Sequence, residues 1–119
     1  MSSRHSIVPH NVRVEEALLG CALLGAYNDL CVQGVTRNWF NDHLHQATWD
    51  MMEGQTGKDP VSLESLSIAA KTDKAFREHG GTVLTLVSMA DEAPFADNWI
   101  TWLPELQKNQ RLRKYQQLG

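Results

Sequence analysis

The feature that most constrains the fold is the apolar stretch from Val8 to Leu24. Pro9 fixes the backbone before it, and Asn11 is a good helix N-cap because its side-chain oxygen can accept a bond from a free amide of the first turn. Gly20 costs a helix about 1 kcal/mol relative to alanine, which indicates close approach of another backbone. Helical spacing of the apolar residues predicts a buried helix from about Val12 to about Gly25. Its apolar face consists of Val12, Val14, Leu18, Leu19, Cys21, Ala22, Leu23 and Leu24.

Further segments with helical periodicity follow along the chain, separated by glycine- and proline-containing turns. The clearest loop is Gly54–Pro60, after which Ser62 is the expected cap of the next helix. Asp97 is the expected cap of the last helix. No succession of alternating strands is present, so the predicted class is all-α. The expected helices after the first are Asp29–Gln33, His43–Glu53, a helix from Ser62, Ala75–His79, Val83–Ala90, and Phe95 to the end.

Composition narrows the class of protein. The chain has 119 residues, of which 42% are hydrophobic and 21% charged, as in a globular domain. The net charge of −3 argues against a dedicated DNA-binding module, which usually has a basic excess. No apolar run is long enough to span a membrane, and no signal peptide precedes the first helix. We therefore expect a cytoplasmic protein, in which Cys21 and Cys31 are reduced core residues.

Catalytic, metal and cofactor motifs are not recognisable in the sequence. Gly57-Lys58 lacks both the glycine five residues earlier and the following serine or threonine that a phosphate-binding loop needs. His43 and His45 would point to different sides of a helix, so they cannot share a metal ion there; His45 is expected to pack and His43 to be exposed. No serine or cysteine lies in a nucleophile motif. We therefore expect no catalytic residue, no cofactor and no metal in this chain.

The last helix has two features that suggest contacts with partners. Trp99 and Trp102 pack in the core or contact a partner, because tryptophan is enriched in interface hot spots. The basic end of the helix is either a solvated face that complements the helix dipole or a contact to DNA. Its basic residues are Lys108, Arg111, Arg113 and Lys114.

Several short motifs, in this order and spacing, resemble the N-terminal domain of DnaB-type replicative DNA helicases. The resemblance runs from Val8 to about Leu118 and begins with Pro9-His10-Asn11, Glu15 and Leu19-Gly20. Later motifs match the family's pattern of an aromatic residue, a histidine, a second aromatic residue and a methionine, then its Pro-Val-Asp-Leu segment, its double glycine and its arginine-rich end. The aromatic–histidine pattern corresponds to Trp39-Phe40 with His45, Trp49 and Met52, and the Pro-Val-Asp-Leu segment to Pro60-Val61-Ser62-Leu63. The double glycine corresponds to Gly80-Gly81 with Leu84, the turn into the last helix to Ala90–Asn98, and the arginine-rich end to Arg111-Leu112-Arg113.

The resemblance implies a compact orthogonal helical bundle followed by a C-terminal helical hairpin. Residues 1–8 would be a flexible tail, residues 9–79 the bundle and residues 80–117 the hairpin. In this family the domain forms the collar of a hexameric helicase, where it pairs with copies of itself and receives primase or a loader protein. ATP and Mg²⁺ belong to a separate motor domain, and DNA is contacted only indirectly. The residues expected at the self-association interface are Leu86, Met89, Trp99, Trp102 and Leu106, with Arg111, Arg113 and Lys114 as a possible basic contact.

Two departures from the family pattern affect the expected hairpin. Pro104 lies inside the last helix, where it should produce a kink, and the aromatic residue that usually follows the double glycine is missing. These changes suggest a divergent bacterial or phage member. The alternative is a stand-alone phage or plasmid adaptor or loader that mimics the collar and binds a host helicase. The uncapped basic end at Gly119 suggests that the chain is cut just before a linker.

Overall fold

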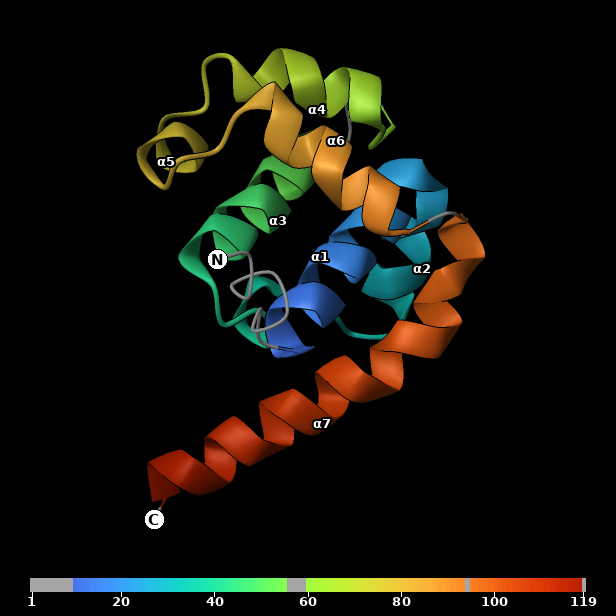
Figure 1. Ribbon diagram of the computed structural model, residues 1–119, viewed down its shortest axis with the longest axis vertical. Helices are drawn as coiled ribbons and strands as arrows, with labels where there is room; N and C mark the ends of the chain where they lie inside the picture. The colour runs from blue at the N-terminus through green and yellow to red at the C-terminus, as the bar shows by residue number, and fades with distance from the viewer. Residues whose placement is uncertain (1–9, 56–59, 94, 119) are drawn as a thin grey trace, which may run out of the picture.

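The computed structural model describes residues 10–55, 60–93 and 95–118, and within these ranges the chain is helical with no strand (Figure 1). The expected tail, most of the loop before Pro60, and Pro94 lie outside the described residues. The all-α class predicted from the periodicity is confirmed. The elements in chain order are α1 (His10–Cys21), η2 (Ala22–Ala26), α2 (Tyr27–Val32), η3 (Arg37–Trp39), α3 (His43–Gln55), α4 (Leu63–Ala70), α5 (Lys74–Glu78), α6 (Val83–Glu92), η4 (Ala96–Asn98) and α7 (Trp99–Leu118).

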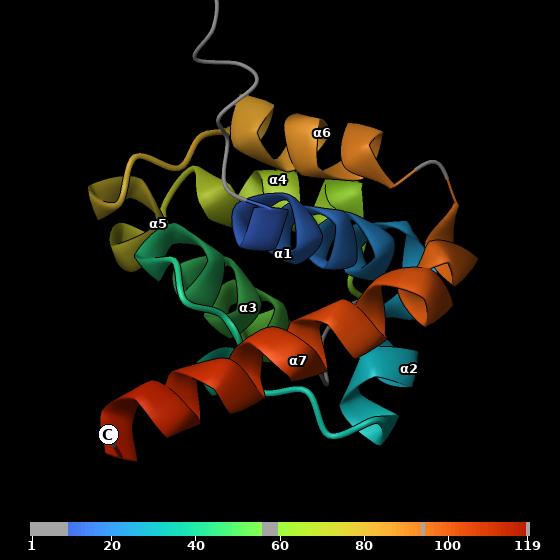
Figure 2. The ribbon, with the colours of Figure 1, turned by 60° about the horizontal axis from the view of Figure 1, so that its bottom comes forward.

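Helix α1 is the centre of the molecule. It packs most extensively on α6 and on α7, and Figure 2 shows it between these two helices. Both faces of α1 are therefore covered, as its broad apolar face requires. One core joins all these elements, and its largest fully buried side chains include Leu18, Leu19, Leu30, Phe40, Trp49, Met52, Leu66, Phe76, Leu86, Met89 and Leu106.

Side-chain caps explain where several helices begin. Ser62 caps α4 as predicted. Its hydroxyl oxygen accepts a hydrogen bond from the amide of Ser65, and the hydroxyl oxygen of Ser65 accepts one from the amide of Ser62. Thr82 and Thr85 form the same capping box at the start of α6. Asp73 caps α5 through the amide of Phe76. These polar residues satisfy amides that would otherwise lack partners.

Two predicted caps are wrong. Helix α1 already begins at His10, so Asn11 lies inside the helix and not at its cap position; its Oδ1 accepts from the amide of its neighbour Val12 at 3.0 Å. Asp97 lies inside the 3-10 turn η4 and forms no cap there. In both places the helical geometry starts one residue before the best capping side chain.

The end of the first helix is a wide turn broken at Gly25. This residue has a φ of 125°, a conformation that only glycine adopts readily, and the chain then re-enters a helix at Tyr27. The prediction that the first helix stops near Gly25 is confirmed. The second helix begins two residues earlier than the predicted Asp29, because the turn at Gly25 leads directly into it.

Gly20 is the point where α1 and α6 cross. A Cβ atom built on Gly20 would overlap the carbonyl oxygen of Met89 and would lie 3.1 Å from Cβ of Ala93. The predicted close approach of another backbone is therefore confirmed. The missing side chain lets α6 settle directly onto α1.

Helices α6 and α7 do not form the expected hairpin. Each packs on α1, and they pack far less closely on each other (Figure 2). Their buried residues belong to the same core as those of α1, so residues 80–117 are not a separate appendage to a bundle of residues 9–79. The physical reason is that α1 is apolar on both sides and takes up both helices.

Pro104 lies inside α7 without ending it. The helix runs from Trp99 to Leu118, with Pro104 in its second turn. A proline there leaves the carbonyl of the preceding turn without its amide partner, which favours bending. Figure 1 shows α7 changing direction near its start before it extends along the molecule.

Candidate functional site

A buried acid–histidine pair joins α1 to α3. Nδ1 of His45 lies 2.7 Å from Oε1 of Glu15, and the two side chains are 4% and 3% exposed. An ionised carboxylate can only accept hydrogen bonds, so with Glu15 charged the proton lies on Nδ1 of His45. The prediction that His45 packs is confirmed, and His43 is exposed.

The carboxylate of Glu15 also holds the loop before α3. The amide of Asn41 donates to its Oε2 at 2.9 Å, and the amide of Asp42 donates to its Oε1 at 3.3 Å. Asp42 in turn caps α3, since its Oδ1 accepts from the amide of Leu44 at 2.8 Å. Both oxygens of Glu15 are thus engaged. This arrangement suits a structural tie between two helices rather than a free general base.

A polar hollow of about 410 Å³ lies beside this pair. Its lining comes from the first turns of α1 and α3 and from the end of α5. The rings of His43 and His79 meet there at an interplanar angle of 52°, with centroids 5.5 Å apart. The lining residues are Asn11, Val12, Glu15, Asn41, Asp42, His43, Leu44 and His79. Within the described ranges, no three histidine, cysteine or acidic side chains are arranged to share a metal ion.

Burial changes the acidity of two groups on α1. Glu16, half-buried beside the pair, has a raised pKa, first because burial disfavours its charge and then because Glu92 is near. Burial also raises the pKa of the Cys21 thiol to about 11. Cys21 lies in the core as predicted, whereas Cys31 is exposed, so the prediction of a second core cysteine is wrong. The end of α2 turns Cys31 away from the core.

The residues predicted for self-association separate into two groups. Leu86, Met89 and Leu106 are 0% exposed and belong to the core, so they cannot touch a partner in this conformation. This corrects the expectation that they form an interface; α1 covers the sides of α6 and α7 that carry them. Trp99 and Trp102 are partly buried against the core. Arg111 is exposed, and the side chains of Arg113 and Lys114 lie outside the described part of the chain.

The exposed apolar residues are different from those expected. On α4 and α6, Ile68 and Leu84 are 71% and 75% exposed, and Val87 is 37% exposed. Before η4 and at the start of α7, respectively, Phe95 and Ile100 are 70% and 63% exposed. A weak signal for the first group exists in the sequence: six of the ten residues of α6 are apolar and they are spread around the helix, so part of them must face outward. Periodicity could not tell which part, because both faces read as apolar.

Comparisons with known protein families, curated proteins and solved structures give no match for this chain. In the ranges that the structure describes, no helix has both the length and the apolar character needed to cross a bilayer.

Proposed function

We propose that this chain is a non-catalytic assembly and docking domain of a replicative DNA helicase, of the kind that forms the N-terminal collar in the DnaB type. It would hold copies of the helicase together and receive primase or a loader protein. The ATP-hydrolysing motor would be a separate domain. The chain would work by protein contacts and would meet DNA only indirectly.

The observation that carries this proposal is that residues of two separate motifs contact each other, and that two motif glycines make room for close packing. Glu15 comes from the opening motif and His45 from the aromatic–histidine motif, yet they form one buried pair across 30 residues of sequence. Gly20 receives the backbone of Met89, and Gly81 leaves room for the ring of Phe76, which a Cβ atom would approach to 2.6 Å. Residues noted separately in the sequence thus fix α1 against α3 and α6, which supports the reading of these motifs as one related pattern.

A docking role is supported by the exposed side chains near the start of α7. Phe95 and Ile100 expose large apolar groups beside the partly buried Trp99. Exposed aromatic and aliphatic groups of this kind are common at the centres of protein interfaces. The family's way of pairing hairpins does not transfer, because α6 and α7 are each held by α1.

The test is to measure binding of the purified chain to the primase and to the intact hexameric helicase of the same host by isothermal titration calorimetry. Binding to primase that is lost in Ile100→Asp supports the collar role. Binding to the helicase hexamer without binding to primase supports the adaptor role instead. Binding to neither contradicts both. Val32→Asp is the matched control, since Val32 is 83% exposed on α2.

A further inference from the structure

The outer face of α4 and α6 is apolar in its middle. The two helices pack side by side, and Ile68, Leu84 and Val87 point away from the core. Leu86 and Met89, on the opposite side of α6, are fully buried. Helix α6 therefore has apolar side chains on two sides, while α1 covers only one. A helix that is apolar on both sides is usually covered on both.

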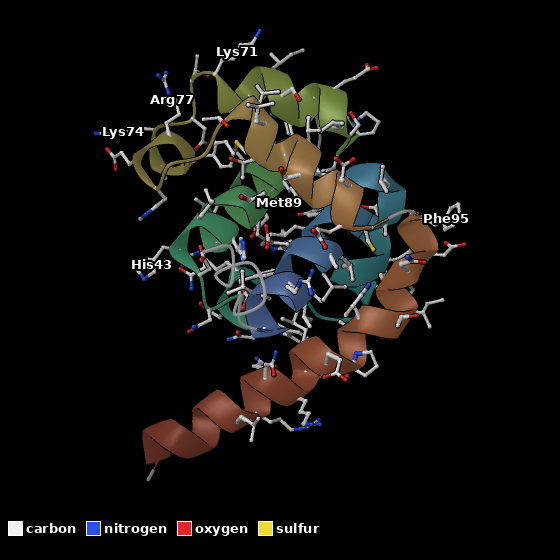
Figure 3. The ribbon with its side chains drawn as sticks, in the orientation of Figure 1. His43, Lys71, Lys74, Arg77, Met89 and Phe95 are labelled. Atoms are coloured by element: carbon white, nitrogen blue, oxygen red, sulfur yellow. The ribbon has the colours of Figure 1, made fainter. Side chains whose placement is uncertain are left out.

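The two ends of this face carry opposite charge. The basic end has Lys71, Lys74 and Arg77, all exposed, at the end of α4 and on α5. Figure 3 shows these three residues together, with Phe95 at the far end of α6. Two carboxylates also lie in the basic end: Asp73, which caps α5, and Glu78, which is 3.9 Å from Lys74. Three cations and two carboxylates leave a net charge of one positive unit.

The acidic end forms because α4 and α6 run in opposite directions (Figure 1). Glu64, in the first turn of α4, lies at the end where α6 finishes with Asp91 and Glu92. All three side chains are exposed. The face thus changes from positive to negative along α6, with the apolar residues between the two ends.

We propose that this face binds the same face of a second copy of the chain, with the two α6 helices antiparallel across a two-fold axis near Val87. A two-fold axis brings the same patch of both copies together, so the patch must be complementary to itself. In the antiparallel arrangement the basic end of each copy meets the acidic end of the other. In a parallel arrangement like charges would meet, which opposes association.

This inference specifies the self-association part of the proposed function and rests on that function only for its biological purpose. Primase binding and dimer formation are separate measurements. A chain that dimerises through this face without binding primase or helicase would contradict the proposed function and leave the dimer in place. A chain that binds primase as a monomer would contradict the dimer and leave the proposed function in place.

The first experiment measures molar mass by sedimentation equilibrium over a wide range of concentrations. The wild-type chain should dimerise, and Leu84→Asp should raise the dissociation constant at least about tenfold, which corresponds to about 1.4 kcal/mol. Leu84 is largely exposed, so the folded state should survive, and circular dichroism checks this. Val32→Asp should leave the mass unchanged. A wild-type chain that stays monomeric, or a dimer insensitive to Leu84→Asp, overturns the proposal.

The second experiment exchanges charges between the ends. Lys71→Glu with Lys74→Glu makes both ends acidic, and Asp91→Lys with Glu92→Lys makes both ends basic. Each double variant alone should lose the dimer because like charges meet, whereas an equal mixture should form a heterodimer. Arg77 is left in place because its Nη1 donates to the carbonyl of Lys71 at 2.8 Å. Failure of the mixture to associate overturns the antiparallel arrangement.

Discussion

At the scale of single residues, Glu15 is the most demanding position in the chain. Its carboxylate is removed from water and bonded to His45 and to two amides of the loop before α3. Breaking such a buried pair leaves charged or polar groups without partners, which costs far more than an exposed ion pair is worth. Loss of Glu15 should therefore loosen the start of α3 and lower global stability.

We expect Glu15→Gln to lower the free energy of unfolding by about 3 kcal/mol, because the neutral amide cannot accept all three bonds. Guanidinium chloride titration followed by circular dichroism measures this. Glu64→Gln, at an exposed position on α4, should stay within about 1 kcal/mol of wild type. The double variant Glu15→Gln/His45→Gln should lose less free energy of unfolding than the sum of the losses in the two single variants, because the two residues interact. Similar losses of free energy of unfolding in Glu15→Gln and Glu64→Gln would argue against Glu15 as a structural link between α1 and α3.

The two cysteines should differ strongly in reactivity. With a pKa of about 11, the buried Cys21 has about one thiolate in a thousand molecules at pH 8, and its Sγ lies 3.8 Å from the carbonyl oxygen of Phe95. Cys31 is exposed. Titration of the native chain with a disulfide reagent should give one fast thiol, which Cys31→Ser removes. A fast thiol remaining in that variant would contradict the assignment.

At the scale of elements, the crossing of α1 and α6 depends on the absence of a side chain at Gly20. We expect Gly20→Ala to destabilise the protein by about 1–3 kcal/mol, because the new Cβ would collide with the backbone of Met89 rather than with a movable side chain. Gly54→Ala in α3 is the matched control. Nothing lies within 4 Å of a Cβ atom there, so Gly54→Ala should raise the free energy of unfolding by up to about 1 kcal/mol. Thermal unfolding of both variants tests the difference.

The sequence predicted individual elements better than their pairing. Ser62 and the stop near Gly25 depend on local chemistry, which a short window of sequence contains. Whether a hairpin forms depends on which element α6 and α7 pack against. The packing partner of both helices is a third element, α1, because its two apolar sides bury the apolar faces of α6 and α7. No local window of sequence contains this pairing.

The same limit applies to the candidate site. Apolar spacing identified Leu86 and Met89 but could not assign them to the core or to a surface, because Leu84 and Val87 give an equally apolar face of α6. The pairing of Glu15 with His45 could not be predicted either. It requires knowing that α1 and α3 start side by side, which is a property of the tertiary structure.

At the scale of the whole molecule, the shared core predicts that the chain folds as one unit. We expect a fragment of residues 1–79 to be unfolded, because it lacks four core side chains: Leu86, Met89, Leu103 and Leu106. Loss of each large buried side chain costs about 2–5 kcal/mol, against a total stability of about 5–15 kcal/mol. Circular dichroism and amide exchange of the fragment measure this. A cooperatively unfolding fragment would restore the division into a bundle and a separate hairpin.

Helix α7 has a mechanical consequence that follows from where it is anchored in the core. Among the side chains described up to Leu112, the last fully buried one is Leu106, and Figure 1 shows the far part of the helix projecting beyond the other helices. From Leu106 to Leu118 the helix works as a lever of about 18 Å, given a rise of about 1.5 Å per residue. A change of about 10° in the direction of the helix at Leu106 would swing its tip by about 3 Å. Small repacking around Leu103 and Leu106 is thereby amplified into a larger displacement at the tip of the helix.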